Sequence, residues 1–276
     1  ADSAAGLISM RHVLRGPSYV TASACASSNN SMIDAFNYIR LGTCVAVVTG
    51  GSEAAIYEAG VGGFNALHAM STRNDDPATA SRPYDKDRDG FVLGEGGAAI
   101  ILEDLEHALA RGARIYAEVL GGGMSSDAYH ITAPHPEGLG AELCMKHALH
   151  DAGLQPTDID YINTHGTSTP IGDPQEVKAI QRLFGEHAYK LNISATKSMT
   201  GHLLGGAGAV EGLAAIMSVY SDVVPPTINH FTDDPEIDPK LNFTFNTAQK
   251  RTVNAAMSNT FGFGGHNTAV IFRKYR

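Results

Sequence analysis

Short strand-like runs alternate with helical patterns along most of the sequence, and this alternation limits the folds open to the chain. The apolar run at 45–48 has the composition of a strand buried on both faces of a parallel sheet. Further strands are predicted at 98–102, 115–120, 159–163, 191–194, 242–245, 255–259 and 268–272. Helices are predicted at 4–14, from Cys25 to about Ile39, and at 54–70, 104–111, 139–152, 173–184 and 206–220. Strands that alternate with helices indicate a layered α/β fold.

The composition narrows the class of protein. With 276 residues, 43% of them hydrophobic, the chain can form one large domain or two coupled ones. A net charge of −9 argues against nucleic acid as a partner. Three scattered cysteines are too few for a disulfide framework or a zinc site and fit a reducing compartment. No apolar run reaches membrane-spanning length and no signal peptide is recognised, so we expect a soluble intracellular protein without a membrane partner.

Cys25 is a candidate nucleophile because of where the local pattern places it. The β-prone run 19–21 precedes it and a helical pattern follows, so it lies at a turn from strand to helix. Ala24 and Ala26 flank it, and small neighbours are what such a tight turn requires. At a helix N-terminus the partial positive charge favours a thiolate over a thiol. A buried structural cysteine in a small-residue turn is the alternative interpretation.

Two of the twelve histidines directly follow predicted strands, where ligands bind in open α/β sheets. His165 lies in Thr-His-Gly-Thr, whose plain alternative is a polar connecting loop. His202 ends Lys-Ser-Met-Thr-Gly-His, with Lys197 before it and Glu211 after it. A lysine held near a histidine keeps the imidazole neutral, although spacing alone does not show that these side chains meet. Neither stretch has metal-ligand spacing.

Two loops complete the set of candidate functional segments. The polar segment 71–89 contains two prolines and is predicted to be a long functional loop. The segment 258–267 contains Phe-Gly-Phe-Gly-Gly between two strands, so it can present a backbone N–H and move an aromatic ring. An ordinary hairpin with aromatic packing is the alternative for this second loop.

Taken together and in this order, these motifs resemble those of the β-ketoacyl-[acyl-carrier-protein] synthases. The motifs are Cys25 at its turn, Thr-His-Gly-Thr at 164–167, Lys-Ser-x-x-Gly-His at 197–202, Phe-Gly-Phe-Gly-Gly at 261–265, and Ser-Arg-Pro-Tyr-Asp at 81–85, Asp-Gly-Phe-Val at 89–92 and Gly-Glu-Gly at 94–96. Each is weak alone, but the ordered set is specific and covers nearly the whole chain. The likeness is strongest to the synthase II type of dissociated fatty-acid synthesis.

The resemblance implies a thiolase-like α/β/α/β/α fold built from two related halves. Residues 1–113 would be the remainder of the N-terminal half and carry the nucleophile, and residues 114–276 would be the C-terminal half and carry both histidines. The family's first third has no counterpart here, and Ala1 stands inside a helical pattern. We therefore expect a fragment with an incomplete first half, which would expose apolar sheet surface.

The resemblance also implies the chemistry of a condensing acyltransferase. Cys25 would accept an acyl group from a carrier-protein thioester, after which malonyl carrier protein would lose CO2 and attack the acyl group. Neutral His165 and His202 would donate hydrogen bonds to the malonyl enolate. Lys197 and Glu211 would support the two histidines structurally and electrostatically.

Further roles are carried over from the family to five residues. The backbone N–H of Phe263, together with that of Cys25, would bind the oxyanion, and the Phe263 ring would act as a gate. Phe64 and Phe261 would contact the acyl group, and Thr167 and Thr169 would contact the pantetheine arm.

The implied partners are acyl carrier protein in its acyl and malonyl forms and a second copy of the chain in a homodimer. No cofactor and no metal are expected, and the location would be a bacterial cytoplasm or an organellar lumen. The candidates for docking the acidic carrier protein are Arg11, Arg15, Arg73 and His68. His266 departs from the threonine of many relatives and adds a titrating group. The acyl length and a monovalent cation near Asn259 and Glu211 are left open.

Three other interpretations compete with a fatty-acid synthase. A ketosynthase domain of a polyketide synthase shares the motifs. A non-catalytic partner of the chain-length-factor type lacks the nucleophile, whereas Cys25 is present, although a truncated chain that binds partners without turnover stays open. A thiolase shares the fold but has a different Cys/His arrangement.

Overall fold

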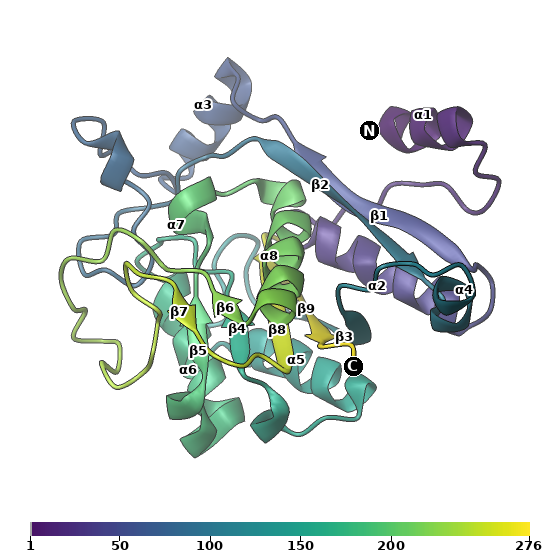
Figure 1. The fold of residues 1–276 in the computed structure, drawn as a ribbon. Coiled ribbons are helices and arrows are strands. Elements are labelled where there is room, and N and C mark those ends of the chain that lie inside the picture. The colour runs from purple at the N-terminus through teal and green to yellow at the C-terminus, as the bar shows by residue number, and fades with distance from the viewer. Residues whose placement is uncertain (1) are drawn as a thin grey trace.

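The computed structural model describes residues 2–276, which form layers of helix and sheet (Figure 1). The α-helices are α1 (Ser3–His12), α2 (Ser27–Arg40), α3 (Glu58–Ala66), α4 (Leu105–Ala110), α5 (Leu139–Ala152), α6 (Gly172–Phe184), α7 (Lys197–Thr200) and α8 (Ala207–Ser221). The strands are β1 (Ala46–Glu53), β2 (Gly96–Glu103), β3 (Glu118–Ser126), β4 (Tyr161–Asn163), β5 (Asn192–Ser194), β6 (Val223–Val224), β7 (Gln249–Lys250), β8 (Ala255–Gly262) and β9 (His266–Arg273).

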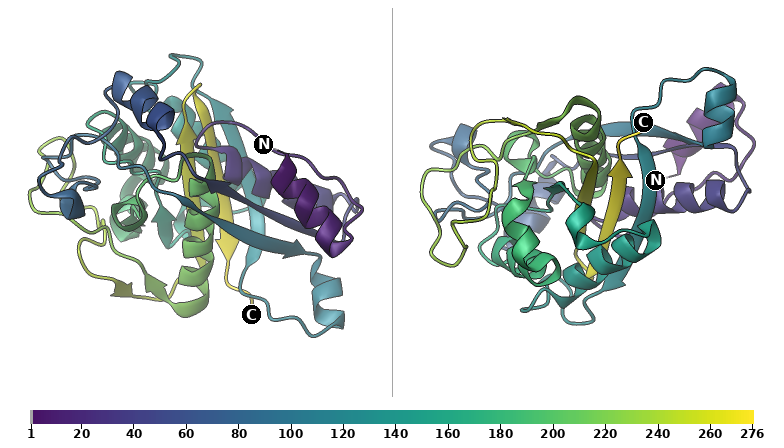
Figure 2. Two further views of the ribbon diagram at one scale, coloured as in Figure 1. Left: turned by 90° about the horizontal axis from the view of Figure 1, so that it is seen from above. Right: turned by 60° about the horizontal axis from the view of Figure 1, so that its bottom comes forward.

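The main sheet has five strands in the order β3-β9-β8-β4-β5. Strands β3, β9 and β8 are antiparallel neighbours, and β8, β4 and β5 run parallel. Helices α5 and α6 cover one face and pack a large apolar core against it. Helices α8 and α2 cover the other face, and α8 lies along β8 and β9 (Figure 2). Because β4 and β5 are parallel, their carboxyl ends lie at the same edge of the sheet, and His165 and Lys197 follow them there.

A second sheet of two strands, β1 and β2, lies on the other side of α2 and α8. The order of layers is thus α5/α6, main sheet, α2/α8 and the β1–β2 pair, which confirms the expected layered α/β architecture. The predicted boundary between residues 113 and 114 stays a prediction.

The prediction of a doubly buried parallel strand at 45–48 is wrong. Strand β1 pairs antiparallel with β2, and Val45 and Val48 are 53% and 40% exposed. Only one face of the pair packs on helices, so Ile101 of β2 is also exposed. An apolar run indicates that a segment prefers burial, but it does not determine strand direction or what covers the outer face.

Two smaller expectations also need correction. The segment 242–245 does not form a strand and makes only isolated bridges, from Asn242 to Asn192 and from Phe245 to Thr227. The β-prone run 19–21 is irregular. In 242–245, side-chain hydrogen bonds such as Asn192 Nδ2 to Thr244 Oγ1 and Asn242 Nδ2 to Gln249 Oε1 take the place of a ladder.

The segment Leu204–Ser221 is long and apolar enough to cross a membrane, with a mean hydropathy of 1.2 over 18 residues. Of this window, 56% is buried inside the protein. The core helix of a folded domain passes the same test, and α8 packs between the main sheet and the β1–β2 pair.

Candidate active site

Cys25 stands two residues before α2, on a tight turn. Its neighbour Ala24 has φ +50°, a left-handed conformation that non-glycine residues rarely adopt and that is frequent at functional sites. The opposing hairpin approaches closely here: a Cβ on Gly262 would lie 2.8 Å from the carbonyl oxygen of Ser23 and 3.1 Å from the nitrogen of Cys25. Only glycine at 262 allows the hairpin to lie this close to the turn.

The thiol of Cys25 is buried and faces groups that can remove its proton and stabilise charge. Nε2 of His202 lies 3.2 Å from the sulfur, and the backbone N–H groups of Phe263 and Cys25 itself donate toward it. Burial raises the pKa of Cys25 to about 11, although Lys197 and these N–H groups oppose the rise. Burial thus outweighs the groups that favour a thiolate, and the resting side chain is a thiol.

His165 lies just beyond β4 and is held by Lys197. Nζ of Lys197 lies 3.4 Å from Nδ1 of His165 and also forms a buried ion pair with Glu211. An ammonium group can only donate, so Nδ1 of His165 accepts and the ring proton is placed on Nε2. Burial, then Lys197 and then His202 lower the pKa of His165 well below its usual value, so the ring is neutral. His165 can therefore present an N–H donor.

His202 reaches the sulfur from the segment between α7 and α8. Burial and then Lys197 lower its pKa well below the ordinary value. Its ring stands edge-on to that of His165 at 5.2 Å and to that of Phe91 at 5.4 Å. Nδ1 of His202 is buried without a hydrogen-bond partner among residues 2–276. Its single proton is thus not fixed on one nitrogen, and Nε2 can accept from the thiol or donate.

Glu176 of α6 is a buried residue that the sequence analysis missed. Its two oxygens each accept a backbone hydrogen bond of 2.9 Å, from the N–H groups of His165 and Gly166. Burial raises its pKa to about 7, and these hydrogen bonds oppose the rise. The sequence carried little signal, because an acidic residue near a helix start is commonly explained by the helix dipole alone.

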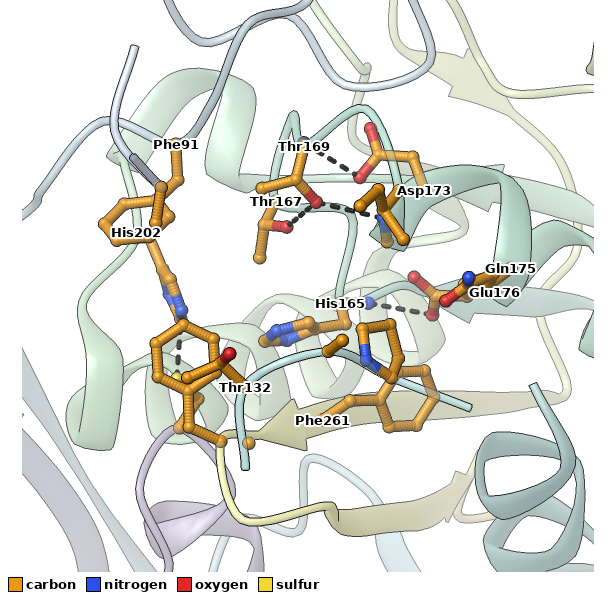
Figure 3. Close-up of a pocket in the computed structure, with 18 of the residues that line it drawn as sticks. Phe91, Thr132, His165, Thr167, Thr169, Asp173, Gln175, Glu176, His202 and Phe261 are labelled. Carbon is orange, nitrogen blue, oxygen red and sulfur yellow. Dashed lines mark hydrogen bonds between the residues drawn. The ribbon is translucent and has the colours of Figure 1, made fainter. Parts of the chain in front are cut away.

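A cavity of about 370 Å³ connects these groups (Figure 3). The predicted residues that line it are Cys25, Phe64, His165, Thr167, Thr169, His202, Phe261 and Phe263. Lys197 and Glu211 lie behind the wall, 1% and 2% exposed at their side chains. Phe91 also lines the cavity and was not predicted as a site residue; its ring stands edge-on to Phe64 at 5.4 Å.

The loop that carries Phe263 is hydrogen-bonded to the segment that follows β3. Gly264 N–H donates to Ile131 O over 2.6 Å, and the Asp127 N–H donates to Gly265 O over 2.9 Å. Nδ2 of Asn267 donates to Oδ1 of Asp127 over 2.8 Å. Asp127 was not predicted, because contacts between two loops leave no periodic pattern in a sequence.

Several buried side-chain oxygens lack hydrogen-bond partners among residues 2–276. They include Oε2 of Glu211, Oδ1 of Asn259 and Oγ of Ser258. No cluster of three or more His, Cys, Asp or Glu residues in this range could hold a metal ion.

The raised pKa of Cys25 predicts how its alkylation depends on pH. Since only the thiolate reacts, the rate of carbamidomethylation should rise about tenfold per pH unit between pH 7 and pH 10. Peptide mass spectrometry measures this rate at Cys25, with half-buried Cys44 followed in the same samples. Circular dichroism at each pH checks that the protein stays folded. A carbamidomethylation rate at Cys25 that does not change between pH 7 and pH 10 would instead show that the resting side chain is a thiolate.

Known proteins share this chain's domains and sequence. Residues 1–108 match the family model "Beta-ketoacyl synthase, N-terminal domain", and residues 116–231 match "Beta-ketoacyl synthase, C-terminal domain". A 3-oxoacyl-[acyl-carrier-protein] synthase 2 from Synechocystis is 50% identical over 276 residues, which is 100% of this chain and 66% of that protein. The Staphylococcus aureus protein of the same name is 49% identical over 274 residues, which is 99% of this chain and 66% of its own length. The chain thus spans about two thirds of these curated relatives.

Solved structures agree with the sequence comparisons. A type II polyketide ketosynthase, solved in complex with its acyl carrier protein, has a TM-score of 0.97 and 34% identity over 99% of this chain and 67% of its own. A β-ketoacyl synthase from Burkholderia phymatum has a TM-score of 0.94 and 40% identity over 100% of this chain and 66% of its own. The chain therefore belongs to the β-ketoacyl synthase family and has its thiolase-like layered fold.

Proposed function

We propose that this protein is a 3-oxoacyl-[acyl-carrier-protein] synthase that elongates fatty acids by decarboxylative condensation. The observation that carries the proposal is the approach of His202 Nε2 to Cys25 Sγ at 3.2 Å, with neutral His165 beside them. The names of the relatives support the same activity. The thiol and the thioesters carry the covalent chemistry, so the mechanism uses no cofactor.

The first half-reaction transfers an acyl group to Cys25. His202 takes the thiol proton, and Sγ attacks the carbonyl carbon of the acyl carrier thioester. The backbone N–H groups of Cys25 and Phe263 donate hydrogen bonds to the oxyanion that develops on the carbonyl oxygen. The bond from the carbonyl carbon to the carrier's sulfur then breaks, and this sulfur leaves with the proton held by His202.

The second half-reaction forms the carbon–carbon bond. The malonyl carboxylate leaves as CO2, and its bonding electron pair remains as an enolate on the carrier thioester. Nε2–H of His165 and Nε2–H of His202 donate to the enolate oxygen, which neutral rings can do without losing a proton. The enolate carbon attacks the acyl carbon on Cys25, and the bond from that carbon to Sγ breaks with its electron pair on sulfur. The thiolate then takes up one proton from solvent, which restores the resting thiol. The lowered pKa values of both histidines keep the donors neutral to well below pH 6.5.

The remaining assignments follow from this activity. Phe64 and Phe261 contact the acyl group, the ring of Phe263 gates the cavity, and Thr167 and Thr169 contact the pantetheine arm. The partners are acyl and malonyl carrier protein and a second copy of the chain, in the cytoplasm. The exposed residues Arg11, Arg15 and His68, with Arg73, stay candidates for docking the carrier.

The direct test of the proposal is formation of the acyl-enzyme. Incubation with an acyl carrier-protein thioester should add one acyl mass to the intact protein, and peptide mapping should place it on Cys25. Cerulenin added first should block the acyl adduct. The matched control is Cys44→Ser, since Cys44 lies outside the cavity lining. An intact, folded protein with no adduct on Cys25 would exclude the enzyme activity.

A polyketide ketosynthase is the second candidate, because the solved relative with a TM-score of 0.97 is one. Its identity of 34% is below the 50% of the fatty-acid synthase relative, which favours fatty-acid elongation. Repeated turnover with malonyl carrier protein alone distinguishes the two. A polyketide ketosynthase would accumulate poly-β-keto thioesters, whereas the proposed enzyme should stop after one condensation until the 3-oxo group is reduced.

A further inference from the structure

The Arg88 guanidinium lies buried behind the cavity wall and joins three separate segments. Its side chain is 4% exposed. It belongs to the motif-rich segment 81–90, which the proposed reaction does not use. Arg88 itself does not line the cavity, but it contacts Thr169, Pro170 and Asp173, which do.

Four hydrogen bonds fix the orientation of this guanidinium. Nε donates to Thr169 O over 3.0 Å and Nη2 donates to Pro170 O over 3.2 Å. Nη1 donates to Asp85 O over 2.8 Å and to Oδ2 of Asp234 over 2.5 Å. The planar fork thus binds two successive carbonyl groups of one loop, a geometry that a lysine ammonium cannot reproduce.

Charge also favours Arg88 at this place. Nε lies 3.6 Å from Oδ2 of Asp173, whose side chain is 1% exposed, and Asp234 is 10% exposed. Two carboxylates from different elements therefore face one buried cation. A buried ion group of this kind holds its geometry because removing one member leaves an unpaired charge.

The loop that Arg88 binds is held by Glu176 at its start and by the segment 81–90 at Ser168, Thr169 and Pro170. Between β4 and α6 the backbone turns through two left-handed residues, Gly166 with φ +32° and Ser168 with φ +67°. The N–H of Gly90 and that of Arg82 hold Ser168 from the same side as Arg88. Without the segment 81–90, the carbonyl groups at Ser168, Thr169 and Pro170 would lose these partners.

This loop also forms one wall of the cavity, where Thr167 and Thr169 lie (Figure 3). Thr167 and Thr169 lie there with their hydroxyl groups 3.0 Å apart, and Oδ1 of Asp173 accepts from Thr169 N–H at 3.4 Å. A shift of the carbonyl groups at Thr169 and Pro170 would move these hydroxyls, which sit on the same short loop.

We propose that Arg88 is a positioning residue that fixes the Thr167–Pro170 wall for the pantetheine arm of both substrates. This inference rests on the proposed condensing activity and extends it to a residue outside the cavity. Arg88 acts on capture of the thioester arm and leaves the reactivity of the Cys25 sulfur unchanged.

The variant Arg88→Lys tests this role because it keeps the charge and loses the fork. We expect KM for malonyl-pantetheine and for malonyl carrier protein to rise by the same factor, about tenfold, with little change in kcat. The rate of Cys25 carbamidomethylation should stay within about twofold of the unmodified protein. Arg273→Lys on β9 is the matched control, since this half-exposed residue pairs with Glu118 and neither residue lines the cavity, and it should leave KM unchanged.

Two further measurements separate positioning from general stability. In a Thr167→Val/Thr169→Val background, Arg88→Lys should have no additional effect on KM, because both changes remove the same wall. Asp234→Asn weakens only the contact between Nη1 of Arg88 and Asp234, and it should also raise KM. This variant provides the test if Arg88→Lys does not fold.

The outcomes are distinct from those of the proposed function. An active enzyme whose KM is unchanged in Arg88→Lys and Asp234→Asn overturns this inference alone. A rise in KM for carrier protein but not for malonyl-pantetheine also overturns it, since that result indicates protein docking. An unmodified protein that forms no acyl-enzyme and releases no CO2 overturns the proposed function, and this inference with it.

Discussion

Replacing Cys25 by glutamine should abolish condensation and preserve the release of CO2 from malonyl carrier protein. Glutamine fills the space of the thiol but has no nucleophile to carry an acyl group, so condensation should fall by about 10³-fold or more. Decarboxylation needs only donors for the enolate, and His165 and His202 remain in place. Release of ¹⁴CO2 and formation of the 3-oxoacyl product are measured in the same reaction.

Two controls make this result specific. Cys44→Ser should retain both activities, since Cys44 does not line the cavity. His165→Ala in the Cys25→Gln background should remove most of the remaining CO2 release, because it deletes one of the two donors. Condensation that persists in Cys25→Gln would show that the nucleophile is another residue.

Of the substitutions considered, removing the charge of Lys197 should lower the free energy of unfolding the most. Lys197→Met leaves the Glu211 carboxylate buried and unpaired, which should lower the free energy of unfolding by about 3–5 kcal/mol. Denaturant unfolding at pH 8 measures this loss. The double variant Lys197→Met/Glu211→Gln should recover much of it, because no unpaired charge is then buried.

The effect of Lys197→Met should also depend on pH in a definite direction. Burial raises the pKa of Glu211 to about 7 even though Lys197 opposes the rise, so removing Lys197 raises it further. The folded state then holds a proton that the unfolded state has released, and the free energy of unfolding falls as pH increases above the ordinary value of 4.5. The difference between single and double variants should therefore be larger at pH 8 than at pH 5. An equal difference at both values would show that Glu211 does not titrate.

Much of the fold could be predicted from local pattern. Helix α5 begins and ends where its apolar spacing indicates, and β8 and β9 lie close to their predicted ranges. The direction of β1 could not be predicted, because pairing depends on a partner about 50 residues away and not on the composition of the strand. The short segment 242–245 failed for a related reason, since side chains such as Asn192 hold it in place of a ladder.

The sequence allowed the proposed reactive residues of the site to be predicted, but not the buried residues that hold them in place. Cys25, His165 and His202 stand at turns that follow strand-like runs, and such positions can be recognised in a sequence. Glu176 could not be, because its role arises from two backbone N–H groups that only the folded loop presents. The pKa of Cys25 could not be predicted for the same reason, because it depends on how deeply the folded chain buries the thiol.

The layered arrangement has a consequence for how such genes can recombine. Cys25 directly precedes α2 in the early part of the chain, whereas the groups around it come from the later part, namely His165, Lys197, His202 and Phe263. A crossover near Gly112 would therefore inherit the sulfur from one parent and all of its chemical partners from the other. Such a chimera works only if both parents place Sγ and Nε2 at the same short separation across the α2–α8 layer. Compatibility between parents thus depends on how α2 packs against α8 and on the hydrogen bond from His202 N–H to Val92 O, which also joins the two parts.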